Sequence, residues 1–182
     1  MIAAYTPTVE EWIAEHGERC EFVGGAIEEK PLPSGSHSDS QMTMGSALHG
    51  YARLTGRGKV RPEWHHRFGI ATDTRIYVPD LAFVLAPKQL DLPEYAECCS
   101  DIMIEIASPN QGAELADKVE FYLRNGARRV WVVDPQRRRV GIYSPDASPR
   151  SIWGEGGVLT DDLLPGFALP LAELFGPTGK IP

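Results

Sequence analysis

The segment DIMIEIASPNQ, residues 101–111, constrains the fold more than any other stretch of this chain. As a β-strand, it places three isoleucines on one face and Glu105 on the other, between Met103 and Ala107. Apolar residues on both faces are typical of a central strand that is covered on both sides. A carboxylate buried there alone would cost several kcal/mol or would take up a proton. The sequence therefore predicts that Glu105 lies at a wet strand end or meets a cation.

Composition indicates an ordinary globular protein around this strand. The 182 residues are 42% hydrophobic and 24% charged, which suits one domain, 1–182, that buries about 70% of its unfolded surface. No apolar run approaches the ~18 residues of a membrane span, and the N-terminus lacks a signal-peptide pattern. Cys20, Cys98 and Cys99 form no CxxC pair, so we expect a reduced, cytoplasmic protein without a zinc site. The net charge of −7 argues against a non-specific nucleic-acid coat protein but is compatible with an acidic metal site.

Turn and periodicity signals predict alternating helices and strands. Thr8 to Glu11 has the Thr-x-x-Glu form of a capping box and opens a short helix. Two short strands are expected within 20–29, about a Gly24-Gly25 turn. Further helices are expected at 37–54, 113–125 and 171–175, and further strands at 59–64, 68–71, 77–85, 102–106, 129–133 and 139–143. The alternation predicts a single α/β or α+β unit, with a mixed sheet flanked by helices.

Two further residues bear on Glu105. Asp80, in YVPDLAFVL, begins the strand expected at 77–85 and shares a face with Ala82. Lys118 lies on the apolar stripe of the helix at 113–125, where a lysine is partly desolvated unless it reaches a carboxylate. Two inward carboxylates and an inward lysine in consecutive elements predict a charge-balanced cluster.

Such a cluster suits phosphodiester hydrolysis. Asp80 and Glu105 would bind a hard divalent cation through oxygen ligands, and the cation would lower the pKa of a bound water. Lys118 would orient that water or stabilise the developing negative charge. Each residue also has a plainer interpretation alone: Asp80 caps a turn, Glu105 lies at an exposed strand end, and Lys118 extends from the stripe edge to solvent. Together they could also form a purely structural ion pair.

Other candidates are weaker. Paired carboxylates also serve as acid and base in glycoside cleavage, but the inward lysine fits that reaction poorly, and no aromatic platform for a sugar is evident. The adjacent His65 and His66 would place their rings on opposite faces of a strand, so a joint metal site is not expected.

Three segments in order, VPDLAFV, IEIASPN and DKVEFYLRNGARRVWVVDP, resemble the bacterial family of putative restriction endonucleases within the PD-(D/E)xK nuclease superfamily. The similarity covers nearly the whole chain. It implies a restriction-endonuclease-like fold with a central mixed sheet, Mg²⁺ or Mn²⁺ as cofactor, and DNA as substrate. Pro79-Asp80 matches the PD motif, and Glu105 matches the acidic residue of its second half.

The chain departs from the superfamily pattern at Ala107, where the usual lysine is missing. The resemblance assigns that role to Lys118 on the following helix, in agreement with the periodicity. Glu114, Glu21 and His37 also match motif positions, and Glu21 or Glu114 would complete the acidic shell. Because strand-symmetric cutting of duplex DNA calls for two active sites, we expect a homodimer. The alternative is a non-catalytic nucleic-acid-binding or regulatory module that keeps the fold, although retention of the acidic pair and lysine counts against it.

Overall fold

The computed structural model describes residues 8–23, 26–68, 75–88, 91–109, 111–154 and 156–176. The expected Gly24-Gly25 turn and the strand residues 69–71 lie outside these ranges. The elements in chain order are α1 (Val9–His16), β1 (Cys20–Val23), β2 (Ala26–Glu29), α2 (Gly35–Thr55), β3 (Gly58–Pro62), β4 (His66–Phe68), β5 (Arg75–Tyr77), β6 (Leu81–Leu85), β7 (Ile102–Ile106), α3 (Gly112–Arg124), β8 (Arg129–Asp134), β9 (Arg139–Ser144), β10 (Ala147–Trp153), β11 (Val158–Leu159), β12 (Leu169–Pro170) and α4 (Leu171–Phe175).

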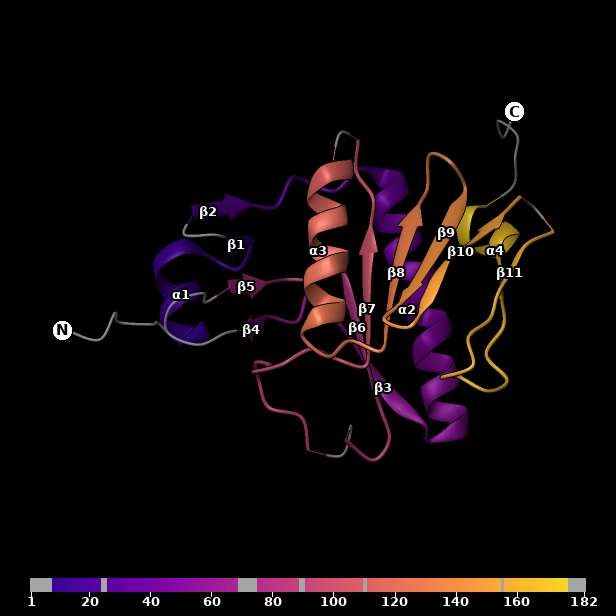
Figure 1. Cartoon of the computed structure of the whole chain (residues 1–182), viewed down its shortest axis with the longest axis horizontal. Helices are drawn as coiled ribbons and strands as arrows, with labels where there is room; N and C mark the ends of the chain where they lie inside the picture. Colours follow the sequence, from indigo (N-terminus) through magenta and orange to yellow (C-terminus); the bar gives the residue numbers. More distant parts are fainter. Residues whose placement is uncertain are drawn as a thin grey trace.

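The main sheet has six strands in the order β10-β9-β8-β7-β6-β3. β7 and β8 run parallel and are connected by α3, whereas the other neighbours in this sheet run antiparallel. Figure 1 shows α3 in front of the sheet and α2 behind it. The predicted mixed sheet flanked by helices is therefore confirmed. Within the described ranges, none of the helices combines the length and apolarity that crossing a bilayer requires.

β7 is buried along its whole length, as its two apolar faces predict. Its isoleucines pack on the α2 side of the sheet, in a cluster that includes Leu48. Met103 packs on the opposite side against Val119 and Tyr122 of α3. Glu105 points to this second side and is buried with it. The position of Glu105 is therefore set by a strand that packing holds on both faces.

The predicted strand 77–85 is wrong in one respect, because the chain breaks it in two. β5 belongs to a small sheet of order β2-β1-β5-β4, and β6 belongs to the main sheet. Pro79 lies at the break, where its missing N–H ends the ladder. The N–H of Val78 donates instead to Oε1 of Glu21, at 2.9 Å. Asp80 consequently lies just before β6 rather than in it, at the point where the two sheets meet.

Other boundaries differ for local reasons. Ser34 caps α2 by accepting from the N–H of His37 at 3.3 Å, so the helix begins two residues earlier than expected. The capping box of Thr8 and Glu11 is confirmed, with both reciprocal bonds present. β10 was not predicted, because it is an exposed edge strand with a bulge and Pro149, and it lacks an alternating apolar pattern.

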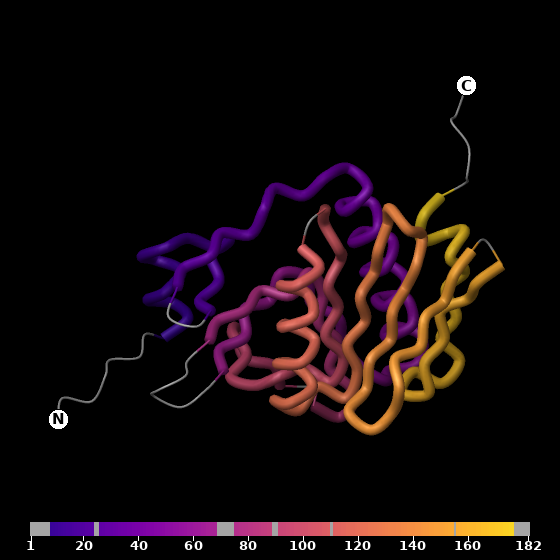
Figure 2. The backbone as a smooth tube through the Cα atoms, turned by 45° about the horizontal axis from the view of Figure 1, so that its top comes forward, coloured from indigo at the N-terminus to yellow at the C-terminus, as the bar shows by residue number. Residues whose placement is uncertain are grey.

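The N-terminal elements lie to one side of the main sheet, and the chain then passes along its upper rim into α2 (Figure 2). This crossing follows β2 and includes Lys30 and Pro31. The crossing lies at the end of the sheet where β7 stops and α3 begins. It therefore brings residues that are distant in sequence close to Asp80 and Glu105. The candidate site lies at this junction.

Candidate active site

A cavity of about 580 Å³ opens where the small sheet, the main sheet and α3 meet. Five of the six predicted site residues line it: His37, Asp80, Glu105, Glu114 and Lys118. The sixth, Glu21 of β1, is buried behind Lys118 and bonded to it. The structure thus brings all six residues into one contiguous group, and Asp80 and Glu105 face the same cavity rather than opposite sides of the sheet.

Asp80 is held from several directions. Its Oδ2 accepts from the N–H of Ile106 at 2.7 Å and lies 3.2 Å from Nε2 of His37. Its Oδ1 lies 3.0 Å from Nζ of Lys30. Burial by itself would raise the pKa of Asp80, but the contacts with His37 and Lys30 outweigh burial and lower the pKa to about 2. Asp80 is therefore a fixed, charged carboxylate.

Glu105 has fewer partners. The Tyr122 hydroxyl donates to its Oε1 at 2.8 Å, and Nζ of Lys118 lies 3.8 Å from the same oxygen. Burial raises the pKa of Glu105 to about 7; Lys118 opposes this rise and Asp80 adds to it. The ion pair with Lys118 thus offsets only part of the effect of burial on Glu105.

Lys118 projects from α3 into the group, as the helical stripe predicts. Its Nζ lies 2.8 Å from Oε2 of Glu21, 3.0 Å from Oε1 of Glu21 and 3.6 Å from Glu114. Burial by itself would lower the pKa of Lys118, but Glu105 and Glu21 outweigh burial and hold the pKa above its usual value. The lysine therefore carries its charge inside the cavity wall. Glu114, which is more exposed, contacts it from one turn earlier on the helix.

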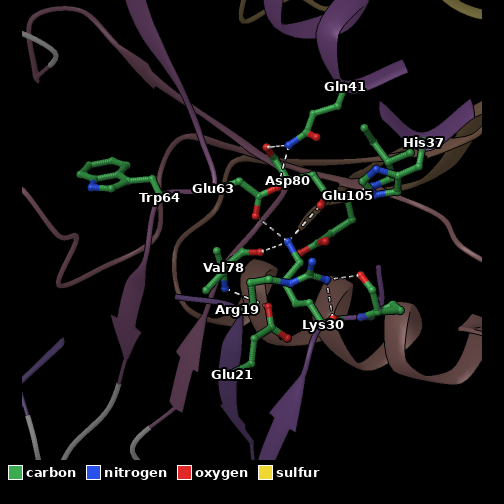
Figure 3. A network of polar contacts seen from close by, with 12 residues as sticks. Arg19, Glu21, Lys30, His37, Gln41, Glu63, Trp64, Val78, Asp80 and Glu105 are labelled. Carbon is green, nitrogen blue, oxygen red and sulfur yellow. Dashed lines mark hydrogen bonds and ion pairs between the residues drawn. The ribbon is translucent and has the colours of Figure 1, made fainter. Parts of the chain in front are cut away.

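Sequence reasoning missed Lys30. Its Nζ donates to the carbonyl oxygen of Val78 at 2.7 Å, to Glu63 at 2.9 Å and to Asp80 at 3.0 Å (Figure 3). Gln41 supports the same group by donating to Glu63 at 2.7 Å and to the Asp80 carbonyl at 2.9 Å. Lys30 follows β2 in an irregular segment, so no periodic signal could have placed it. Tyr122, by contrast, lies one turn after Lys118 on the same buried face of α3, so its inward direction follows from the helical period.

The donor set fits a hard divalent cation in its chemistry. Asp80, Glu105 and the carbonyl of Val78 offer oxygen ligands of the kind that Mg²⁺ and Mn²⁺ prefer. The ammonium of Lys30 already lies against two of these groups, so this position accepts a cation. Across the described ranges, no group of three His, Cys, Asp or Glu side chains is arranged as a ready-made metal site. A metal would therefore rely on two carboxylates, main-chain oxygen and water.

His65 and His66 do not form a joint site with these residues. The His66 ring is buried, with its nitrogens 2.6 Å from the Trp64 carbonyl oxygen and 2.9 Å from the Ser100 hydroxyl. Burial lowers the pKa of His66 to about 4, so the ring is neutral. His65 lines the cavity, whereas His66 is not among the residues that line it.

Comparison with known proteins places this geometry in context. No curated protein sequence matches the chain. A solved structure from Anabaena variabilis, described as a putative nuclease, matches with a TM-score of 0.78 and 22% identity, over 93% of this chain and 98% of that one. This likeness shows a shared fold. The sequence model of the family described as "Putative restriction endonuclease" matches residues 6–172. The chain therefore belongs to the putative restriction endonuclease family.

Proposed function

We propose that this protein is a metal-dependent endodeoxyribonuclease that hydrolyses phosphodiester bonds in the cavity described above. The convergence on one cavity of Asp80, which lies just before β6, Glu105 of β7 and Lys118 of α3 carries the proposal. Membership of the family and the nuclease-like fold support a nuclease in general. The choice of metal, substrate and residues is our inference.

In this proposal, Asp80 and Glu105 hold Mg²⁺ or Mn²⁺. Such an ion, when bound, activates a water and neutralises charge that builds up on the phosphate. The Ile106 N–H and His37 fix the orientation of Asp80, and the Tyr122 hydroxyl fixes that of Glu105.

Lys118 has a different task. Its charge is held beside Glu21, and its ammonium can donate a hydrogen bond to the attacking water or to a phosphate oxygen. Glu114 lies within reach of the same ammonium and would position it. Glu21 therefore acts through Lys118 and is a positioning residue.

The proposal extends to partners. Duplex DNA with two strands calls for two active sites, so a homodimer remains our prediction, as does a cytoplasmic location. One observation favours the alternative of a non-catalytic binding module. Lys30 already lies within salt-bridge distance of Asp80, and Lys118 lies within salt-bridge distance of Glu105. A structural ion-pair network needs no metal.

Cleavage of long, mixed-sequence duplex DNA with Mn²⁺ or Mg²⁺ tests the proposal. We compare wild type with Asp80→Asn and with Asp101→Asn as a matched control. Asp101 is likewise buried, accepts from a main-chain N–H at 2.9 Å and pairs with a lysine at 3.1 Å, but it does not line the cavity.

We expect wild type and Asp101→Asn to cut only with metal, and Asp80→Asn to cut at least about 100-fold more slowly, the usual scale for losing a charge-stabilising group. Equal cutting by all three proteins would mean that the activity lies elsewhere. No cutting by any of them, on double or single strands and with either metal, would favour the binding module.

A further inference from the structure

Lys30 is a charged residue that lines the cavity, and the proposed hydrolysis assigns no task to it. Its side chain is 15% exposed, and its ammonium contacts oxygens from Glu63, which follows β3, and from Val78 and Asp80, which lie between β5 and β6. Figure 3 shows the ammonium at the centre of these contacts, with Glu105 close by. Three protein oxygens therefore surround one positive charge, and the same oxygens could bind a different cation.

Comparison with Lys88 shows that this environment is more than an ordinary salt bridge. Lys88 also pairs with a buried carboxylate, because its Nζ lies 3.1 Å from Oδ1 of Asp101. Its side chain, however, is 70% exposed, against 15% for Lys30. Lys30 has exchanged most of its hydration for protein oxygens, and it has done so at the carboxylate that the proposed metal requires.

The two oxygens of Asp80 have different neighbours. Oδ2 is occupied by the N–H of Ile106 and by His37, which hold the carboxylate in place. Oδ1 is the oxygen that contacts Lys30. A metal bound through Oδ1 would therefore share this oxygen with an ammonium, and like charges at such short range in a buried site repel strongly.

We propose that Lys30 is the resident cation of the metal site: its ammonium and a divalent metal compete for Oδ1 of Asp80 and the carbonyl of Val78, and Lys30 must leave Asp80 before the metal binds. This inference rests on the proposed function, because it takes Asp80 as a metal ligand. It gives Lys30 a role in metal binding that neither the motif positions nor the helical periodicity contains.

The surroundings of Lys30 allow its side chain to leave while its backbone stays. Arg19 donates to the carbonyl oxygens of Lys30 at 2.7 Å and Pro31 at 2.6 Å, which anchors the main chain. Glu63 is 49% exposed at the side of the cavity, and Gln41 holds its other oxygen. Glu63 can therefore keep the ammonium after Asp80 releases it.

Direct Mn²⁺ binding, measured by calorimetry at constant pH, tests the competition without relying on DNA cleavage. We compare wild type with Lys30→Met, which keeps the apolar stem, Lys30→Arg, which keeps the charge, and the matched control Lys88→Met. We expect Lys30→Met to bind Mn²⁺ at least about tenfold more tightly than wild type. Lys30→Arg and Lys88→Met should stay within about threefold of wild type, a difference well under the tenfold step.

Equal or weaker binding by Lys30→Met overturns the inference, as does an equal gain in Lys30→Arg, because loosening rather than charge would then explain it. Asp80→Asn separates this failure from failure of the proposed function. If Asp80→Asn no longer binds Mn²⁺ while Lys30→Met binds it no more tightly than wild type, only the proposed competition between Lys30 and the metal is refuted. If Asp80→Asn binds like wild type, the metal is not at Asp80. Should Lys30→Met fail to fold, Lys30→Gln replaces it with the same expectation.

Discussion

Replacing Lys118 with methionine tests the electrostatic balance of the site most directly. Lys118 is 4% exposed, and two of the carboxylates that it contacts, Glu21 and Glu105, are equally inaccessible to water, whereas the third, Glu114, is partly exposed. Methionine retains the apolar stem of lysine but removes the ammonium. Glu21 then keeps the Val78 N–H, and Glu105 keeps the Tyr122 hydroxyl, but neither retains the nearby positive charge of Lys118.

The expected cost follows from this burial. Removing one partner of a buried ion pair typically lowers the free energy of unfolding by about 3–5 kcal/mol, because an uncompensated charge remains inside. Total stabilities are about 5–15 kcal/mol, so the variant should be marginally stable but measurable. The Lys88→Met control removes an exposed partner and should cost at most about 1 kcal/mol.

Urea denaturation of the metal-free protein at pH 8 measures these differences. A second substitution, Glu21→Gln, should recover part of the loss in the double variant, with a coupling energy of about 1–3 kcal/mol between the two positions. A loss below about 1 kcal/mol for Lys118→Met, with the fold intact, would refute the buried ion pair. Additive effects of the two substitutions would show that Glu21 is not its principal partner.

Two further predictions concern groups around the site and in the core. Tyr122→Phe removes the hydroxyl that donates to Glu105 at 2.8 Å. Urea denaturation at pH 8 should show that the free energy of unfolding falls by about 1.5–3 kcal/mol. An unchanged midpoint would mean that this hydrogen bond contributes nothing to stability. Burial lowers the pKa of His66 to about 4, so between pH 6.5 and pH 4 the unfolded chain binds more protons than the folded one. The free energy of unfolding should therefore fall by up to about 3 kcal/mol as the pH decreases through this range, and His66→Gln should lack that part of the slope.

The sequence was informative wherever a short-range period defines a side chain's direction. The alternation in 102–106 predicted a doubly covered strand with Glu105 on one face, and the stripe in 113–125 predicted an inward Lys118. Both follow from the repeats of β-strand and α-helix, which local sequence displays. The family resemblance added Glu21, Glu114 and His37, which periodicity does not reveal.

Alternation alone did not predict the break at Pro79, although the proline itself is a local signal for one. Alternation continues through 77–85, yet the missing N–H of the proline divides it between two sheets. Lys30 was not anticipated for a related reason, because it lies in an irregular segment fifty positions before its partner Asp80. An irregular segment has no period from which its direction could be read.

Within regular elements, the sequence by itself determined that Glu105 and Lys118 point inward, because strand and helix repeats depend only on neighbouring residues. Tertiary structure decided which of those side chains meet. Glu21 and Lys118 are 97 positions apart, and they touch because the small sheet docks beside α3. Lys30 reaches Asp80 because the chain crosses the rim of the main sheet. Such contacts depend on how whole elements pack, and a buried charge takes whichever opposite charge that packing brings within a few ångströms.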